Sequence, residues 1–266
     1  MRYIMNREKL NLFPLKRELM EDIAIYALMW FATFCIAALT VPTGFGLATL
    51  LTPVVLFVVD DPFVAIGLVA LIHGWHNCVK LTVLRQHVDL DALRRFGFAL
   101  LIGALIGAVL HIYIQSDFLL FLVGCALIFL PLFKLHSALS SFRLPDQYDR
   151  IGGFASGFMG GLTGHQGALR AMFLHQRLTD KAAFSATAAT LAIVVDFTRI
   201  PIYFIHDPTF IGDYIIECIL LLSSAFFGVQ LGKRWLQAWS SKTIQSIIYV
   251  GLVLSGIFYI VESGII

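Results

Sequence analysis

The chain has 266 residues, of which 59% are hydrophobic and only 14% charged, with a formal net charge of +2. A water-soluble domain carries roughly 25% charged residues. The composition therefore excludes an ordinary soluble domain and predicts an all-α integral membrane protein, because apolar stretches of about 20 residues can cross the hydrocarbon core of a bilayer.

The first 21 residues carry charges of both signs and lack the pattern of a cleavable signal peptide. We expect them to form a short amphipathic segment at the membrane surface. The apolar region that follows, residues 22–59, is interrupted by TVPTGFG, and a second one, residues 148–177, is interrupted by LTGHQG. Irregular backbone at membrane depth survives only where protein or a watery cavity covers it. Both interruptions are therefore predicted to line a cavity.

Six uninterrupted apolar runs are expected to cross the membrane, three after each interruption. Gly103 and Gly107 in the second run have the small-xxx-small spacing that allows close helix packing. The six runs cover residues 63–84, 95–114, 117–135, 182–205, 215–232 and 243–261.

The interruptions expose an internal repeat. In each half, a threonine-glycine pair in the broken region precedes a helix that bears an amide or carboxylate and, three residues later, a cation. We therefore divide the chain into two repeats, residues 22–135 and 148–262, joined by a linker at 136–147; such halves with interrupted helices are typical of secondary transporters. The aligned residues are Thr43-Gly44 with Thr163-Gly164, and Asn77 and Lys80 with Asp196 and Arg199.

The distribution of charge predicts the orientation. The positive-inside rule places the basic clusters in the cytoplasm and the acidic loops outside. The second interrupted region then starts and ends inside as a re-entrant hairpin, and the first starts and ends outside, which favours inverted repeats. Against this, the N-terminal tail is basic and residues 22–40 are long enough for a full crossing. The basic clusters lie at 85–95, 134–150, 177–181 and 233–242, and the acidic loops at 59–62 and 206–213.

One predicted helix carries polar residues on a single face. A charge deep in a bilayer costs several kcal/mol, so such residues usually face the bundle interior. The lysine could instead reach the surface from a helix end, and the histidines could be hydrogen-bonding core residues. The four residues, spaced i, i+3, i+4 and i+7, are His73, His76, Asn77 and Lys80.

Asp196 and Arg199 lie three residues apart on the equivalent helix of the second half. They could form a purely structural ion pair. A carboxylate that holds a guanidinium in place also leaves other N–H donors available for an oxyanion, so the two roles are compatible.

A helix that begins after Gly44 or Gly164 presents unpaired N–H groups and the positive end of its dipole, and both features favour an anion. Glycine also lets a ligand approach the backbone closely, although these glycines could simply permit tight helix crossing. With Lys80 and Arg199 supplying charge, the predicted ligand is a small, compact oxyanion. The candidate binding residues are Thr43, Gly44, Gly46, His76, Asn77, Lys80, Thr163, Gly164, His165, Gln166, Gly167, Asp196 and Arg199.

This layout resembles the sulfite exporter TauE/SafE family of membrane transporters, from about residue 25 to residue 262. The resemblance implies a secondary transporter, expected to be an exporter, that moves sulfite, organosulfonates or related sulfur oxyanions across the plasma membrane, here the bacterial inner membrane. The matching segments are VPTGFGLATLLTP (41–53), NCVK (77–80), GGFASGFMGGLTGHQGALR (152–170) and DFTR (196–199).

The chain departs from the family pattern at the second interruption, where His165 and Gln166 stand in a shortened glycine run. Their side chains could retune substrate choice, or His165 could carry a coupling proton because the ordinary pKa of histidine is near 6.5. Arg170, about one turn further on, could equally be a cytoplasmic anchor.

An anion channel and an intramembrane enzyme stay open as alternatives. The sequence has no HExxH, GxSxG or Walker motif, and HGWH (73–76) is at most a weak metal pair. We therefore expect no enzymatic activity, no cofactor and no metal. The expected partners are a small anionic substrate and membrane lipid, without nucleic acid, and a homodimer stays open.

Overall fold

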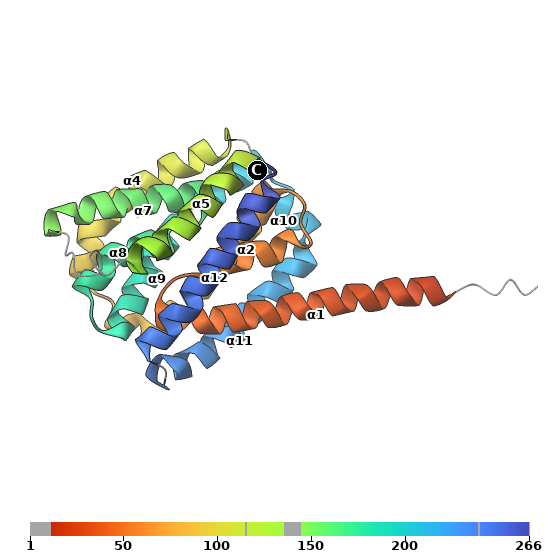
Figure 1. Ribbon diagram of the computed structural model, residues 1–266, viewed down its shortest axis with the longest axis horizontal. Coiled ribbons are helices and arrows are strands. Elements are labelled where there is room, and N and C mark those ends of the chain that lie inside the picture. The colour runs from red at the N-terminus through yellow and green to blue at the C-terminus, as the bar shows by residue number, and fades with distance from the viewer. Residues whose placement is uncertain (1–11, 115, 136–144, 239, 266) are drawn as a thin grey trace, which may run out of the picture.

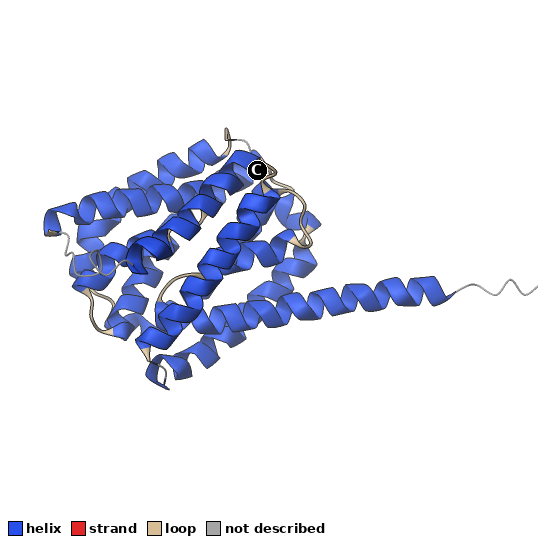
Figure 2. Cartoon of the chain, viewed as in Figure 1, coloured by secondary structure: helices blue, strands red, loops and turns tan. Residues whose placement is uncertain are grey.

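The computed structural model describes residues 12–114, 116–135, 145–238 and 240–265, and within these ranges every regular element is a helix (Figures 1 and 2). The predicted all-α class is therefore confirmed. The α-helices are α1 (Leu12–Thr43), α2 (Leu47–Leu56), α3 (Pro62–Leu84), α4 (Leu90–His111), α5 (Ser116–Leu135), α7 (Asp149–Thr163), α8 (Gly167–Arg177), α9 (Lys181–His206), α10 (Phe210–Asp213), α11 (Ile215–Ala238) and α12 (Ser241–Glu262), with short 3₁₀ turns at Arg85–His87 and Asp146–Tyr148.

Five helical segments in the described ranges are long and apolar enough to cross a membrane, so the protein is a multi-pass membrane protein. One of them lies in α1, which the sequence left ambiguous between a crossing and half of an interrupted region. Because α1 begins at Leu12, the boundary predicted after residue 21 falls inside a helix. The segments are Ile23–Thr43, Pro62–His87, Leu90–His111, Lys181–His206 and Ile215–Leu236.

Aspartates fix where three of the long helices begin. Each one stands at the N-cap and accepts a hydrogen bond from a first-turn N–H group that has no partner inside the helix. Short loops can therefore reverse the chain between α2 and α3, between α3 and α4, and between α8 and α9. The caps are Asp61 to the Phe63 nitrogen (2.8 Å), Asp89 to the Ala92 nitrogen (2.8 Å) and Asp180 to the Ala183 nitrogen (2.7 Å).

Glycines bring α4 and α7 into backbone contact. A Cβ added at Gly157 would lie only 2.9 Å from the Cα of Leu100, and one added at Gly103 would lie 2.8 Å from the Phe158 nitrogen. The close packing predicted for Gly103 and Gly107 is therefore confirmed. Gly228 of α11 likewise allows close packing against α1, because a Cβ there would lie 2.6 Å from the Ala37 Cβ. Figure 1 shows both helix pairs side by side.

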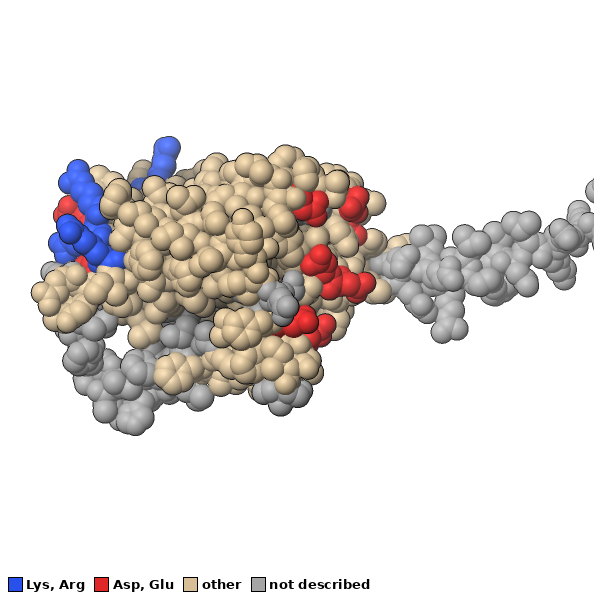
Figure 3. All heavy atoms as spheres, turned by 90° about the horizontal axis from the view of Figure 1, so that it is seen from above, with Lys and Arg blue, Asp and Glu red and all other residues tan. Residues whose placement is uncertain are grey.

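Charge is separated along the bundle (Figure 3). We call the two regions the basic end and the acidic end. This separation is what the orientation predicted from the loops requires, with the basic end in the cytoplasm. Judged by the helix ends at which they lie, the basic end comprises Arg85, Arg94, Arg95, Arg150, Arg177, Lys181, Lys233 and Arg234, interspersed with Asp89, Asp91, Asp149 and Asp180, and the acidic end comprises Asp60, Asp61, Asp207, Asp213, Glu217 and Glu262.

The contact between α4 and α7 can be tested with Gly157→Ala. The added Cβ would overlap the backbone of Leu100, so α4 and α7 must separate, and we expect a loss of stability of roughly 1–3 kcal/mol. The measurement is the apparent melting temperature of purified protein in detergent. Gly97→Ala is the matched control, since a Cβ at this α4 position meets nothing within 4 Å. Equal melting temperatures for the two variants would contradict the contact.

Candidate functional site

The crossing of α3 and α9 builds the polar interior of the bundle. The two helices pack closely at Gly74, where an added Cβ would lie in van der Waals contact with the Asp196 Cβ, at 3.4 Å. Polar side chains from the two helices then face each other, and each is at most 6% exposed. These are His73 and Asn77 of α3 and Asp196 and Arg199 of α9.

Asp196 links the two helices through charged hydrogen bonds. Its Oδ1 accepts from Arg199 Nε at 3.0 Å and Nη2 at 2.8 Å, and its Oδ2 lies 2.6 Å from His73 Nδ1. Asn77 Nδ2 lies 3.2 Å from the other ring nitrogen of His73. Since an amide nitrogen can only donate, His73 Nε2 accepts and Nδ1 donates to Asp196. Asn77 thereby orients the imidazole, and Asp196 orients the guanidinium.

Arg199 keeps one guanidinium nitrogen without a partner in the described structure, and this nitrogen lies against the second interruption. Its Nη1 is buried and has no hydrogen-bond partner among the described residues. A Cβ added at Gly164 would lie 2.5 Å from this nitrogen. Gly164 also has φ of +81°, a left-handed conformation that favours glycine. Both the turn and the guanidinium therefore require glycine here.

The second interruption adds further polar groups. His165 Nε2 lies 3.3 Å from the Tyr259 hydroxyl, and the His165 backbone N–H donates to Thr163 Oγ1 at 3.2 Å. Gln166 Oε1 accepts from Arg170 Nη1 at 3.0 Å. His165 Nδ1 and Gln166 Nε2 are buried without partners in the described structure. The break between α7 and α8 thus carries polar atoms that nothing in the described protein satisfies.

Arg170 lies beside the second interruption and was not among the candidate binding residues predicted from the sequence, which left it open as a cytoplasmic anchor. It is only 2% exposed, so it lies in the interior and is not a cytoplasmic anchor. The signal that could have found it is its spacing, since Arg170 stands one helical turn after Gln166 and the i,i+4 pair can hydrogen-bond on one face.

Lys80 is also buried, at 1% exposure, so it does not reach the membrane surface. Its ammonium group lies within electrostatic range of Arg170, and no described carboxylate balances it. The described interior of the bundle therefore holds three buried basic side chains, Lys80, Arg170 and Arg199, and the carboxylate of Asp196. The other buried carboxylates of the described residues, Asp149 and Glu217, lie at the basic and acidic ends, where they contact Arg177 and Tyr26, respectively.

The first interruption is less polar. Gly44 and Gly46 have φ of +75° and +106°, and Thr43 Oγ1 donates to the Phe45 carbonyl at 2.9 Å. Phe45 reaches the second interruption, because a Cβ added at Gly167 would lie 2.5 Å from the Phe45 Cβ. The two interruptions therefore touch inside the bundle. Neither α2 nor α8 has a side-chain cap at its N-terminus, which leaves first-turn N–H groups available.

His76 lies apart from the Asp196 cluster. Its Nε2 is 3.2 Å from the Ala37 carbonyl and 3.5 Å from Thr40 Oγ1, so it joins α3 to α1. This position fits the alternative of a hydrogen-bonding core histidine. In the described ranges no three His, Cys, Asp or Glu side chains gather as a metal ion would need.

Aromatic rings cover Arg199 on the side of the acidic end. Tyr203, one turn after Arg199, donates from its hydroxyl to the Gly161 carbonyl at 2.5 Å. Its ring centroid lies 4.6 Å from that of His111 and 5.6 Å from that of Phe63. Arg199 itself is 0% exposed, so the cluster is closed on this side.

The excess of positive charge predicts an unequal response to substitution within the buried ion pair. Asp196→Asn leaves every nearby cation without its carboxylate and should cost roughly 3–5 kcal/mol. Arg199→Gln leaves Asp196 close to other cations and should cost less. The double variant Asp196→Asn/Arg199→Gln should recover part of the loss of Asp196→Asn. Thermal unfolding in detergent, without added anions, measures all three.

The exposed pair Asp91 and Arg94, whose side chains are 76% and 80% exposed, provides the matched control. Asp91→Asn/Arg94→Gln should change stability by no more than about 1 kcal/mol. An Asp196→Asn variant as stable as Arg199→Gln would contradict the excess of interior positive charge.

Comparison of the sequence with known protein families finds a match. The family model described as Sulfite exporter TauE/SafE matches residues 29–259, a range that includes both interruptions and the Asp196 cluster. No curated protein and no solved structure matches the chain significantly. Because the match covers far more than half of the 266 residues, the chain belongs to the sulfite exporter TauE/SafE family of membrane transporters.

Proposed function

We propose that the protein is a secondary transporter that exports a small sulfur oxyanion, such as sulfite or an organosulfonate, across the bacterial inner membrane. One observation carries the proposal: the described interior of the bundle buries three basic side chains, Lys80, Arg170 and Arg199, against a single carboxylate away from its two ends, Asp196. Burying uncompensated charge is costly. An anion bound among these cations would balance the charge.

The free hydrogen-bonding groups favour an oxyanion. Arg199 Nη1 and Gln166 Nε2 are buried donors without partners among the described residues, and His165 Nδ1 is a third group that can donate in one tautomer. An oxyanion offers several acceptor oxygens around one centre, which suits a guanidinium and nearby N–H groups. The uncapped N-termini of α2 and α8 would add backbone donors and positive dipole ends.

The remaining predicted residues hold the proposed anion-binding side chains in position. Thr43 and Thr163 hold the two turns through their hydroxyl groups. Asn77 positions His73, which in turn contacts Asp196. Gly167 provides the contact between the two interruptions. In this assignment Lys80, Arg170 and Arg199 bind the substrate, and the other residues position them.

The helix packing supports inverted repeats. If α1 to α5 correspond to α7, α8, α9, α11 and α12, the pairing of α1 with α11 matches that of α7 with α4, and α3–α9 and α5–α12 pair across the axis. Gly124 and Gly256 face each other's backbone in the α5–α12 contact. Rocking one half against the other around the Asp196 cluster would give alternating access.

The two hairpins support opposite orientations in the membrane. Asp149 at the start of α7 and Arg177 at the end of α8 are bonded together at the basic end, so the α7–α8 hairpin enters and leaves there. Tyr26 in α1 bonds to Glu217 at the acidic end, and α2 leads to Asp60 and Asp61 at that same end. These positions fit two re-entrant hairpins that approach each other from opposite faces.

The proposed anion site can be tested with Lys80→Gln, Arg170→Gln and Arg199→Gln. Each variant removes one charged donor, worth about 1.5–3 kcal/mol, so anion binding should weaken roughly ten- to a hundredfold. Thermal shift of the purified protein can compare sulfite, sulfate, thiosulfate, sulfoacetate, taurine and carboxylate controls. Counterflow in proteoliposomes would then separate a carrier from a channel.

The control for these variants is Arg234→Gln, which removes an exposed charge at the basic end and should leave binding unchanged. Size-exclusion chromatography checks that each variant is folded. Wild-type affinity in three folded interior variants would rule out the site.

His165 can be tested separately with His165→Gly. The backbone and the three cations stay in place, so anion binding should persist. Selectivity among anions should change, because the substitution removes the imidazole, whose Nδ1 has no partner in the described structure, from the second interruption. Transport measured between about pH 5.5 and 8 tests whether His165 also carries a coupling proton. Tyr259→Phe, which removes only the hydroxyl that contacts His165, is the matched control. A His165→Gly variant with the wild-type profile would exclude a role in selectivity or proton coupling.

A further inference from the structure

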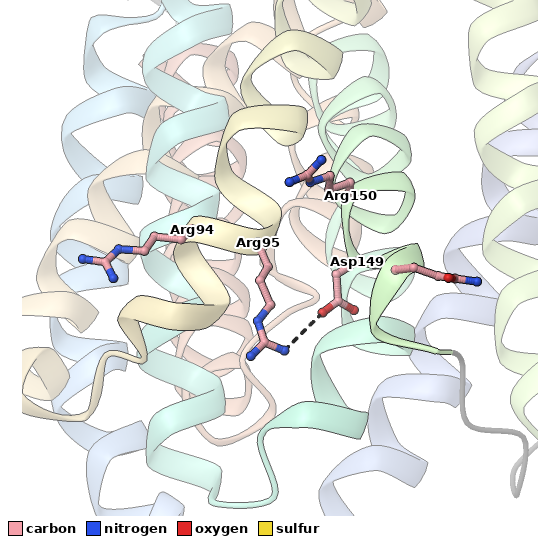
Figure 4. Close-up of a pocket in the computed structure, with 5 residues that line it drawn as sticks. Arg94, Arg95, Asp149 and Arg150 are labelled. Carbon is pink, nitrogen blue, oxygen red and sulfur yellow. Dashed lines mark ion pairs between the residues drawn. The ribbon is translucent and has the colours of Figure 1, made fainter.

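A second charged cavity lies far from the Asp196 cluster, at the basic end of α4 and α7. It has a volume of about 580 Å³ and is lined by Arg94, Arg95, Gln147, Asp149 and Arg150 (Figure 4). Arg94 and Arg95 come from α4, and Arg150 comes from α7. Three guanidinium groups and one carboxylate therefore give the cavity a net positive charge.

The carboxylate in this cavity is already engaged. Asp149 accepts from Arg177 Nε at 3.2 Å and from Arg177 Nη2 at 3.0 Å, and Arg95 lies 3.9 Å from its other oxygen. Figure 4 shows Arg95 turned toward Asp149 and Arg94 turned away from it. Asp149 therefore offers little negative charge to Arg94 and Arg150.

Arg94 and Arg150 remain accessible to a ligand. Arg94 pairs only loosely with Asp91, at 3.8 Å between two largely exposed side chains, a type of contact worth little. Arg150 is exposed at the start of α7. The two residues belong to different helices, so a ligand that meets both would bridge α4 and α7.

Below these arginines, both helices present apolar side chains outward. Phe98 and Leu101 follow Arg94 by one and two turns of α4 and are 75% and 44% exposed. Phe154 follows Arg150 by one turn of α7 and is 40% exposed. In a membrane protein such a surface contacts lipid tails. The cavity thus combines cations at the depth of the headgroups with an apolar surface directly beneath them.

We propose that this cavity binds the phosphate of an anionic phospholipid, whose acyl chains lie along Phe98, Leu101 and Phe154. Basic pockets at the cytoplasmic ends of transmembrane helices suit anionic headgroups, and guanidinium groups match phosphate oxygens through paired hydrogen bonds. A soluble anion would use the charge but would leave the adjoining apolar surface unused. The lipid would fasten α4 of the first half to α7 of the second.

The test uses the full chain in detergent micelles mixed with phosphatidylglycerol or phosphatidylcholine, with Arg94→Gln/Arg150→Gln as the variant. We expect phosphatidylglycerol to raise the melting temperature of the wild type, with phosphatidylcholine inactive. The variant should fold, because both side chains are exposed. It should retain roughly tenfold less phosphatidylglycerol by native mass spectrometry and lose the thermal shift.

The matched control is Lys233→Gln/Arg234→Gln, which removes the same charge from exposed positions at the same end and should respond as the wild type. An Arg94→Gln/Arg150→Gln variant that still responds, or a control that loses the response equally, would overturn the proposal. So would an equal thermal shift from inorganic phosphate, which would indicate a site for a soluble anion. Since Lys80, Arg170 and Arg199 are untouched, binding of sulfite reports separately on the proposed transport site.

Discussion

The polar interior of this protein depends on one carboxylate that cannot neutralise its surroundings. Asp196 fixes His73 and Arg199 in place, yet Lys80 and Arg170 are buried in the same bundle. In a medium of low dielectric constant such an excess of positive charge is costly, and membrane proteins retain it where a counter-charge arrives as part of the function. The same excess explains the need for a rigid scaffold, and the proposed affinity for an anion rests on it.

Glycine provides that scaffold. Along α4–α7 and α1–α11 it removes side chains from the contact, so the backbones themselves touch. Neighbouring α3 and α9 cross beside Gly74, where His73 meets Asp196. The second interruption, however, carries more polar side chains than the first. His165, Gln166 and Arg170 stand where the aligned positions of the first half hold Phe45, Gly46 and Leu50, so the second half contributes most of the donors.

The helical class, the two interruptions and the Asp196–Arg199 pair could be predicted from sequence, because each depends on local features: apolar length, glycine placement and i,i+3 spacing. The bond from His73 to Asp196 could not, since 123 positions separate the residues and only the tertiary crossing brings them together. The sequence left Arg170 undecided: its i,i+4 spacing from Gln166 allows a hydrogen bond on one helix face, but the short helix after the break does not show whether that face points into the bundle or toward the cytoplasm. His76 lies on the same helix face as Lys80, so the sequence grouped the two residues. That face is broad, and His76 contacts α1 instead of the Asp196 cluster.

The bond between Asp149 and Arg177 has a mechanical consequence. It joins the first residue of α7 to the last residue of α8. The ion pair therefore holds these two helix ends together. If the hairpin moves, its two helices therefore move together and rotate about the Asp149–Arg177 ion pair. A small tilt near Asp149 would be magnified at the distant tip, where Gly164 rests against the guanidinium of Arg199.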